Sequence, residues 1–266
     1  MKLRTLLIAG ALTASLSLPA GALTLRVNGT DRTELARAEL MGDTTYVSLR
    51  AVAAMLDEEA VVTWSRGTAR VETQSLFLSA RPGDPYIQAN GRCFYVSGGV
   101  KLKHGVTMVP LRTLASAMGG GVTWEGASRT AHLTPGSGVP QAADYDTEDL
   151  YWLSRIISAE SRGEPFRGKL AVGTVVLNRV AHKEFPNTVK EVIFDRRWGG
   201  QFQPVTNGTV YDDPTEESVA AAKLCLEGVR VAGESLYFLA PELTNNHWIM
   251  ENRDYVTTIG CHWFYA

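Results

Sequence analysis

The stretch DTEDLYWLSRIISAESRGEP, residues 146–165, decides the fold of the C-terminal half of this 266-residue chain. Asp146 followed by Glu148 and Asp149 is typical of a helix start, because a capping carboxylate and further acids favour the positive end of the helix dipole. An apolar stripe at helical spacing follows, made of Leu150, Leu153, Ile156 and Ile157. The stretch therefore predicts an amphipathic helix that packs against the rest of a domain and ends near Gly163.

Glu160 lies on the apolar face of this predicted helix, in its last turn and three residues after Ile157. A carboxyl held against apolar side chains loses solvation, so its pKa rises into the range where it can donate a proton near neutral pH. Cleavage of a glycosidic bond requires such an acid, because the leaving oxygen is protonated as the bond opens. A structural glutamate paired with Arg155 or Arg162 is the alternative for this position.

Further helix starts follow, and together with this helix they predict a mostly helical α+β domain over residues 147–266. Pro165 favours the first turn of a second helix. Thr188-Val189-Lys190-Glu191 and Asp213-Pro214-Thr215-Glu216 both fit the capping-box pattern that starts a helix, and they predict two further helices. We therefore expect four helices in this domain.

Strand and loop signals complete the domain. Residues 235–239 and 255–265 are rich in β-branched and aromatic residues, which predicts the strands of a small sheet. Residues 195–212, between the last two helices, form a long loop that contains Gln201 and Phe202. Loops of this length inside a compact domain are usually functional, so we expect this one to border the site.

The N-terminal half contains an internal repeat. TYVSLR at residues 45–50 recurs as TMVPLR at residues 107–112, 62 positions later, and VNG at residues 27–29 recurs at the same offset as ANG. Each unit combines an Asn-Gly hairpin turn with strands and one short helix. The pattern predicts a small duplicated α+β module over residues 23–135. Residues 136–146, rich in Gly, Pro and Ala, are expected to form a linker.

Residues 1–22 predict a secretory signal peptide. Lys2 and Arg4 precede an apolar segment, and Ala20-Gly21-Ala22 has the small-x-small pattern of a cleavage site. The apolar segment is too short and too interrupted to span a bilayer, so we expect no stable membrane insertion after cleavage. The mature chain is expected to begin at residue 23.

Charge and cysteine content exclude several classes of protein. With 26 Lys and Arg against 28 Asp and Glu, the formal net charge of −2 argues against a nucleic-acid partner. Cys93, Cys225 and Cys261 match no zinc-site spacing, and we expect neither a metal nor a cofactor. Cys225 with Cys261 is the one disulfide pair we consider, and three free thiols are the alternative.

Several separated motifs in the second half carry a resemblance: WLSRIISAESRGEPFRGKLAVGTVVLNRVAHKEFPNTVKEVIF, GGQFQPV, SLYFLAP and TIGCHWFYA. In this order and spacing they resemble the SleB-type family of spore-cortex-lytic cell wall hydrolases over residues 148–266. The resemblance implies a lysozyme-like fold and cleavage of peptidoglycan glycan strands. It also implies that Glu160 is catalytic and that Gln201 and Phe202 line the cleft. Tyr237 and His262 are further substrate-binding candidates, although a structural role is favoured for His262.

YVSLRAVAAML and MVPLRTLASAMGGGVTW carry a second resemblance, over residues 23–135, to the copper amine oxidase N-terminal-like domain. That domain is often attached to exported bacterial proteins. Its name does not imply copper here, because His104, His132 and Cys93 are isolated from one another in the sequence. We expect a targeting or spacer module.

These features predict a secreted enzyme that acts on peptidoglycan in the cell wall or spore cortex. Glu160 is the one carboxylate with a persuasive placement, since Asp195, Asp212 and Asp213 have no spacing that fixes them opposite it. A single carboxylate favours lytic transglycosylation, in which Glu160 acts as general acid and then base, over hydrolysis. A non-catalytic wall-binding protein is the alternative. A metallopeptidase is disfavoured, because its motifs are absent and the histidines are scattered along the chain.

Overall fold

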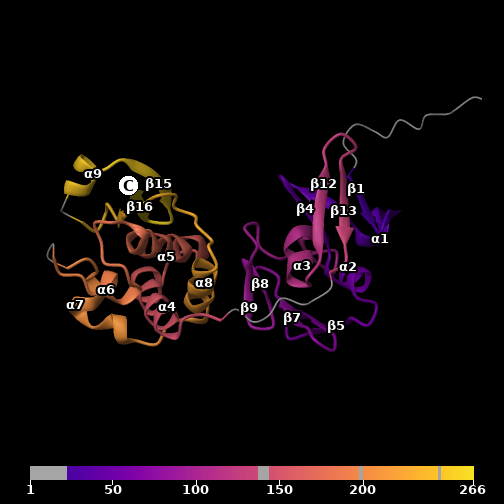
Figure 1. Ribbon diagram of the computed structural model, residues 1–266, viewed down its shortest axis with the longest axis horizontal. Coiled ribbons are helices and arrows are strands. Elements are labelled where there is room, and N and C mark those ends of the chain that lie inside the picture. Colours follow the sequence, from indigo (N-terminus) through magenta and orange to yellow (C-terminus); the bar gives the residue numbers. More distant parts are fainter. Residues whose placement is uncertain (1–22, 137–143, 198–199, 245–246) are drawn as a thin grey trace, which may run out of the picture.

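The computed structural model describes residues 23–136, 144–197, 200–244 and 247–266. The predicted signal peptide and most of the predicted linker lie outside the described residues. Figure 1 shows a strand-rich N-terminal region, residues 23–136, beside a helix-rich C-terminal region, residues 144–266. Within the described ranges, no helix is long and apolar enough to cross a membrane.

The N-terminal region is built from short strands and three short helices among its described residues. They are β1 (Thr24–Val27), β2 (Thr30–Asp31), α1 (Thr33–Ala36), β3 (Glu39–Met41), β4 (Thr44–Ser48), α2 (Leu49–Leu56), β5 (Val61–Ser65), β6 (Thr68–Glu72), β7 (Phe77–Ala80), β8 (Tyr86–Ala89), β9 (Arg92–Tyr95), β10 (Lys101–Lys103), β11 (Val106–Pro110), α3 (Leu111–Ala117), β12 (Gly121–Glu125) and β13 (Thr130–Thr134). The strands form sheets in the orders β12-β13-β1-β2, β10-β11-β4-β3 and β5-β6-β7-β8-β9.

The two sequence units of this region follow the same order of elements. β3, β4, α2, β5 and β6 correspond to β10, β11, α3, β12 and β13. β4 and β11 pair antiparallel, and Val47 lies opposite Val109, which is 62 positions later in the chain. Both predicted Asn-Gly turns are hairpins: Asn28 and Asn90 have φ of 50° and 49°, as a tight turn of this kind requires.

The C-terminal region contains the four predicted helices. Its elements are α4 (Thr147–Ser161), α5 (Phe166–Ala181), α6 (Val189–Ile193), α7 (Gln203–Asn207), the 3-10 helix η1 (Thr209–Tyr211), α8 (Glu216–Leu226), β14 (Tyr237–Leu239), α9 (Trp248–Asn252), β15 (Tyr255–Ile259) and β16 (His262–Tyr265). As predicted, the side chain of Asp146 caps α4 and that of Thr188 caps α6. The cap of α8 is Thr215, two residues after Asp213, where the predicted capping box begins.

Two short α-helices and one 3-10 helix were not expected. The segment 195–212 is not a continuous loop, because α7 and η1 form within it. Pro204 stands in the first turn of α7, and Gly208 ends the helix with a φ of 86°, so both ends of this short helix are set by local backbone chemistry. The second addition, α9, lies between β14 and β15.

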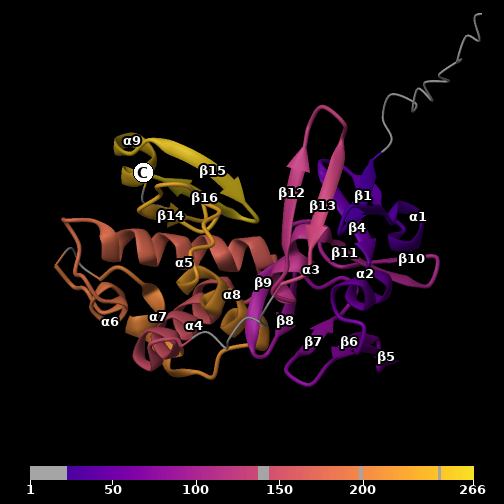
Figure 2. The same cartoon turned by 45° about the vertical axis from the view of Figure 1, so that its right-hand side comes forward.

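The apolar face of α4 forms the centre of the C-terminal core. Leu153, Ile156 and Ile157 have no exposed surface, and α4 packs against α5 and α8. Gly173 of α5 permits a close approach to α8, because a methyl group there would come within 2.7 Å of the Cys225 Sγ. The sheet β14-β16-β15 lies on the other side of α5 (Figure 2). This packing fixes the end of α4, where Glu160 lies.

The Cys225–Cys261 pairing considered from the sequence is wrong, because Cys93, Cys225 and Cys261 are all free. Cys225 is fully buried, and its thiol donates a hydrogen bond to the Leu170 carbonyl. Cys261 lies on the exposed turn between β15 and β16. The two thiols therefore occupy opposite environments, one in the core and one at the surface.

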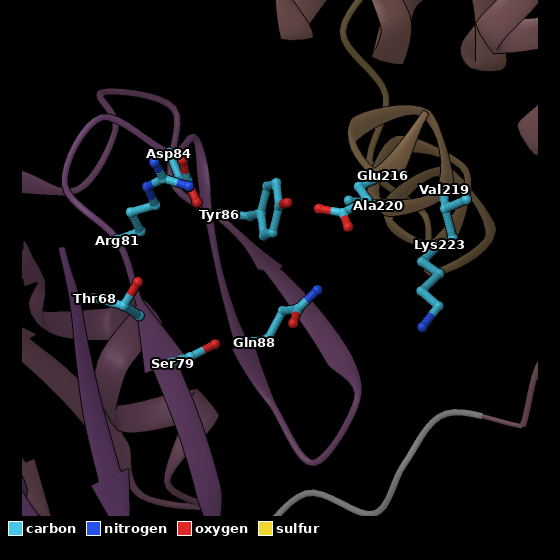
Figure 3. Close-up of a pocket in the computed structure, with 10 residues that line it drawn as sticks. All are labelled: Thr68, Ser79, Arg81, Asp84, Tyr86, Gln88, Glu216, Val219, Ala220 and Lys223. Atoms are coloured by element: carbon cyan, nitrogen blue, oxygen red, sulfur yellow. The ribbon is translucent and has the colours of Figure 1, made fainter. Parts of the chain in front are cut away.

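The N-terminal region packs against the C-terminal region along α8. Arg92 Nε of β9 lies 2.5 Å from Glu227 Oε2, just after α8, and the rings of Tyr86 and Phe166 are 5.4 Å apart. Beside these contacts lies a polar cavity of about 470 Å³. Figure 3 shows Tyr86 pointing from the sheet toward Glu216 of α8 across this cavity. The predicted module is therefore in contact with the rest of the protein.

Candidate active site

Glu160 lies in the last turn of α4, on the same helix face as Ile156 and Ile157, and it is mostly buried. Burial raises the pKa of its carboxyl to about 7, and the nearby Arg179 guanidinium counteracts part of this rise. A carboxyl with this pKa is substantially protonated near neutral pH and can also lose its proton there. Glu160 can therefore act as an acid in one step and as a base in the next.

A cavity of about 290 Å³ opens beside Glu160. One side is the end of α4, and the other is formed by α7, η1 and the residue after them. The side chains that can form hydrogen bonds in its lining belong to Glu160, Arg162, Gln203, Asn207, Thr209 and Asp212. Amides, a hydroxyl and carboxyls around a modest hollow suit a ligand rich in hydroxyl and N-acetyl groups.

Asp212 is a second acidic residue in the lining of the cavity beside Glu160, although no sequence spacing placed it opposite Glu160. The other loop acids are engaged elsewhere. Asp195 is buried and holds Arg197, whose Nη2 lies 2.8 Å away, and these hydrogen bonds lower the Asp195 pKa. Asp213 forms an exposed pair with Arg155. Sequence spacing missed Asp212, because the turn made by α7 and η1 brings it to the cavity.

The predicted pair Gln201 and Phe202 lies directly before α7, but neither lines the cavity. Gln201 is partly exposed. Phe202 is 3% exposed and packs in the core, with its ring 6.4 Å from that of Phe238. Phe202 therefore anchors the start of the cavity-lining helix, and contact of either residue with a sugar stays a prediction.

Arg179 of α5 lies near both Glu160 and the predicted residue Tyr237. It is buried, it donates from Nε to the Leu236 carbonyl at 2.7 Å, and its guanidinium lies 5.6 Å from the Tyr237 ring. Burial lowers its pKa to about 10, so it remains charged near neutral pH. Its Nη1 has no hydrogen-bond partner. Sequence reasoning missed Arg179, because only the fold brings it near Glu160.

His262 is not among the residues that line this cavity. It is 8% exposed in β16, and its ring meets that of Phe238 edge-on at 5.2 Å. Burial lowers its pKa. His262 instead lies beside Glu164, which agrees with the structural role favoured from the sequence more than with substrate binding.

In the N-terminal region, two of the residues considered from the sequence as possible copper ligands lie in different surroundings. His132 lies 3.7 Å from Glu125 at the surface, and Cys93 is buried against α8. In the described part of this region, no three potential metal ligands lie together.

Comparison with known proteins finds a separate family match for each of the two regions. Residues 163–265 match the cell wall hydrolase family, and residues 15–133 match the copper amine oxidase N-terminal domain family. The spore cortex-lytic enzyme of Bacillus cereus is 36% identical over 129 residues, which cover 48% of each chain. That of Bacillus subtilis is 32% identical over 120 residues, 45% of this chain and 38% of the relative. The chain thus spans about half the length, or less, of these relatives.

Two solved structures are also similar. The catalytic domain of the germination-specific lytic transglycosylase SleB from Bacillus anthracis is 36% identical, with 48% of this chain and 100% of that chain covered and a TM-score of 0.43. The catalytic domain of Bacillus cereus SleB is 36% identical, with 49% and 100% covered and a TM-score of 0.42. The C-terminal region of this chain thus matches the cell wall hydrolase family and is similar to spore cortex-lytic enzymes, and its N-terminal region matches the copper amine oxidase N-terminal domain family.

Proposed function

We propose that the protein is a lytic transglycosylase that cleaves peptidoglycan glycan strands with Glu160 as its catalytic acid and base. The observation that carries the proposal is a carboxyl with a pKa of about 7 on the wall of a polar cavity. The similar proteins named as spore cortex-lytic enzymes support peptidoglycan as the substrate. The cell wall or the spore cortex is the proposed place of action.

The reaction needs two proton transfers by the same group. Protonated Glu160 first donates its proton to the glycosidic oxygen as the bond to the muramic acid anomeric carbon breaks. The resulting carboxylate then takes the proton of the muramic acid 6-hydroxyl, whose oxygen closes on the anomeric carbon. The products are a 1,6-anhydro sugar and a free hydroxyl on the leaving sugar, and Glu160 is protonated again.

The cavity lining supplies groups that could hold the sugar during this reaction. The amides of Gln203 and Asn207 offer both donors and acceptors, which match an N-acetyl group. We propose these residues, with Thr209, as substrate contacts in addition to Gln201, Phe202 and Tyr237. The last three border the cavity-lining helix or Arg179 and are proposed to shape the site.

Asp212 makes hydrolysis the competing reaction, because a second carboxylate across the bond could activate water. Digestion of purified cell walls and spore cortex in water labelled with heavy oxygen distinguishes the two. Transglycosylation gives anhydro ends that carry no label. Hydrolysis gives labelled reducing ends, and mass spectrometry of the released muropeptides would show them.

Three variants sharpen this experiment. Glu160→Gln should lose cleavage by about 10² to 10⁴ in rate, because an amide of the same shape cannot donate the proton. Asp212→Asn should keep anhydro products if Asp212 only binds sugar. The neighbouring exposed Asp213→Asn is its matched control. Labelled reducing ends that disappear in Asp212→Asn would instead establish a two-carboxylate hydrolase, and an inert wild-type protein would favour a non-catalytic wall-binding role.

We also propose the finer points of the architecture. A duplication in residues 23–135 is supported by the facing of Val47 and Val109 across β4 and β11. A lysozyme-like fold for residues 147–266 is supported by the acid at the end of α4 and by the small sheet that packs against α5. Cleavage of a signal peptide after residue 22, with residues 136–146 as linker, completes the proposal. N-terminal sequencing of the exported protein tests the cleavage position.

A further inference from the structure

Glu164, Cys261 and His262 come together at the surface of the C-terminal region, although 97 positions separate the first two. One potential ligand atom from each residue lies within 4.8 Å of the others. The Cys261 Sγ is 2.7 Å from Glu164 Oε1, and the His262 Nδ1 is 3.9 Å from Glu164 Oε2. The group thus presents a thiol, an imidazole and a carboxylate to one point.

The His262 imidazole has an unused nitrogen in this group. His262 is 8% exposed, and its Nδ1 is buried without a hydrogen-bond partner. A buried polar nitrogen without a partner is costly, and a bound ion is one of the recognised explanations for such a group. The neighbouring Glu164 is too far for a hydrogen bond at 3.9 Å, so the nitrogen faces it across a gap.

The backbone around the group allows the turn that carries Cys261 to lie close to the Glu164 carboxylate. Gly260 has a φ of 61°, and a methyl group on it would lie 1.7 Å from Glu164 Oε2. The Cys261 backbone N–H donates to the same carboxylate at 3.1 Å. On the other side, the buried Lys169 donates from Nζ to the Glu164 carbonyl at 2.7 Å. Both Glu164 and the β15–β16 turn are therefore held in place.

We propose that Glu164, Cys261 and His262 form a binding site for one divalent transition metal ion, with zinc as the best match. One sulfur, one nitrogen and one oxygen ligand suit the borderline-soft Zn²⁺, whereas Ca²⁺ and Mg²⁺ prefer oxygen ligands alone. Binding displaces the thiol proton of Cys261 into solvent, so the bound ligand is the thiolate. Three protein ligands leave a fourth position for water.

The site joins two parts of the domain that are distant in sequence. Glu164 lies between α4 and α5, and the other two ligands lie at the start of β16. None of the three lines the cavity beside Glu160. A metal here would tie the end of the helix that carries Glu160 to the small sheet and stabilise the fold, without entering the reaction.

The test uses the whole chain, stripped with a chelator and dialysed against zinc or cobalt(II) ions alone. We expect one zinc ion per chain by metal mass spectrometry and a higher thermal midpoint with zinc than without. Cobalt(II) should give the near-ultraviolet absorption of a thiolate–cobalt bond. A chain that retains no zinc, or a cobalt spectrum without that absorption, overturns the proposal.

Cys261→Ser is the main variant, because Cys261 is exposed and its replacement leaves the core intact. It should abolish the cobalt absorption and weaken zinc binding about 100-fold or more, since loss even of an outer partner costs about 10–100-fold. His262→Gln should also weaken binding. Glu242→Gln is the matched control, because Glu242 acts on Cys261 only through its charge. Equal zinc affinity in Cys261→Ser and Glu242→Gln would rule the site out.

Discussion

The guanidinium of Arg179 lowers the pKa of the Glu160 carboxyl, while the burial of Glu160 raises it and prevails. Arg179 is itself buried, and its hydrogen bond to the Leu236 carbonyl holds it in place. The pKa of Arg179, about 10, keeps it charged over the range in which Glu160 titrates. The pKa of the proposed catalytic acid is thus set by two opposing effects, burial in the core and a fixed positive charge.

Replacement of Arg179 should move the pH dependence of the reaction. Cleavage needs protonated Glu160, so kcat/KM is expected to fall as pH rises through about 7. Arg179→Met removes the charge that lowers the Glu160 pKa, so the falling limb should shift to higher pH. The pH profile on soluble glycan fragments measures this shift.

A merely structural role of Arg179 would lower activity without moving the limb, so an unshifted limb in Arg179→Met would contradict the electrostatic assignment. Arg167→Met provides the control, because Arg167 is an exposed arginine of the same helix. Its profile should match that of the wild-type protein.

Glu160 should also make the fold less stable at high pH. Its pKa rises from 4.5 to about 7 on folding, so the folded state binds this proton more tightly than the unfolded state. The resulting stabilisation is complete below the unfolded value and is lost as pH rises through about 7. A shift of this size corresponds to about 3 kcal/mol at most, because one pKa unit is about 1.4 kcal/mol.

Glu160→Gln should therefore match the wild-type protein near about pH 4 and exceed its free energy of unfolding at about pH 8 by up to about 3 kcal/mol. Urea unfolding at both pH values measures this difference. Glu148→Gln is the control on the same helix, where Lys190 lowers the pKa of an exposed carboxyl. It should give no gain at high pH, and a similar gain there would show that the effect is not specific to burial.

Local sequence patterns predicted the helix that carries Glu160. They could not predict the contacts between Glu160 and residues that are distant in the sequence. The cap at Asp146 and the stripe through Ile157 depend on neighbours within one or two helical turns, so the sequence predicts α4 well. Arg179 and Asp212 reach the site through the packing of α5 and the turn formed by α7 and η1. No spacing rule relates either residue to Glu160.

The same limit explains why the sequence did not predict that Glu164, Cys261 and His262 lie together. A search for ligands at regular spacing finds scattered histidines, because the chain brings Glu164 to the β15–β16 turn only after the whole region has folded. The short helix α7 was missed for a different reason. A five-residue helix has too few positions to show periodicity, and its surroundings have the composition of a loop.

Gly260 should tolerate no side chain. Alanine there needs a positive φ of 61° and puts its methyl group 1.7 Å from Glu164 Oε2. We expect Gly260→Ala to cost about 2–4 kcal/mol, since a left-handed non-glycine residue alone costs about 1–2 kcal/mol and steric displacement adds to it. Urea unfolding of the full chain measures the loss.

Gly233→Ala is the matched control for this substitution. Gly233 also has a positive φ, 54°, but a methyl group there would lie 3.4 Å from the Val256 side chain, which is ordinary contact. It should cost about 1–2 kcal/mol, the backbone effect alone. Equal losses in the two variants would mean that the Glu164 carboxylate moves away at little cost.

Glu227 should couple the N-terminal region to the catalytic region. Its carboxylate accepts hydrogen bonds from Arg92 Nε at 2.5 Å and from the Tyr145 hydroxyl, and 15% of its side chain is exposed. Glu227→Ala removes both bonds and leaves the partly buried Arg92 without its counter-ion. A partly buried pair of this kind is worth more than a surface pair, so a loss of about 1–3 kcal/mol is expected at the interface.

If the N-terminal region holds the enzyme near its polymeric substrate, Glu227→Ala should slow the digestion of intact sacculi severalfold. Cleavage of short soluble glycans should be unchanged, because Glu227 lies after α8 and does not line the cavity beside Glu160. Dye release from labelled sacculi and chromatography of the short glycans measure the two rates. Glu234→Ala, at an exposed glutamate of the same region, should change neither. Equal losses on both substrates in Glu227→Ala would instead show that the interface supports the fold of the active site. A short glycan cannot contact both regions at once, so its cleavage would slow only if the active site itself were disturbed.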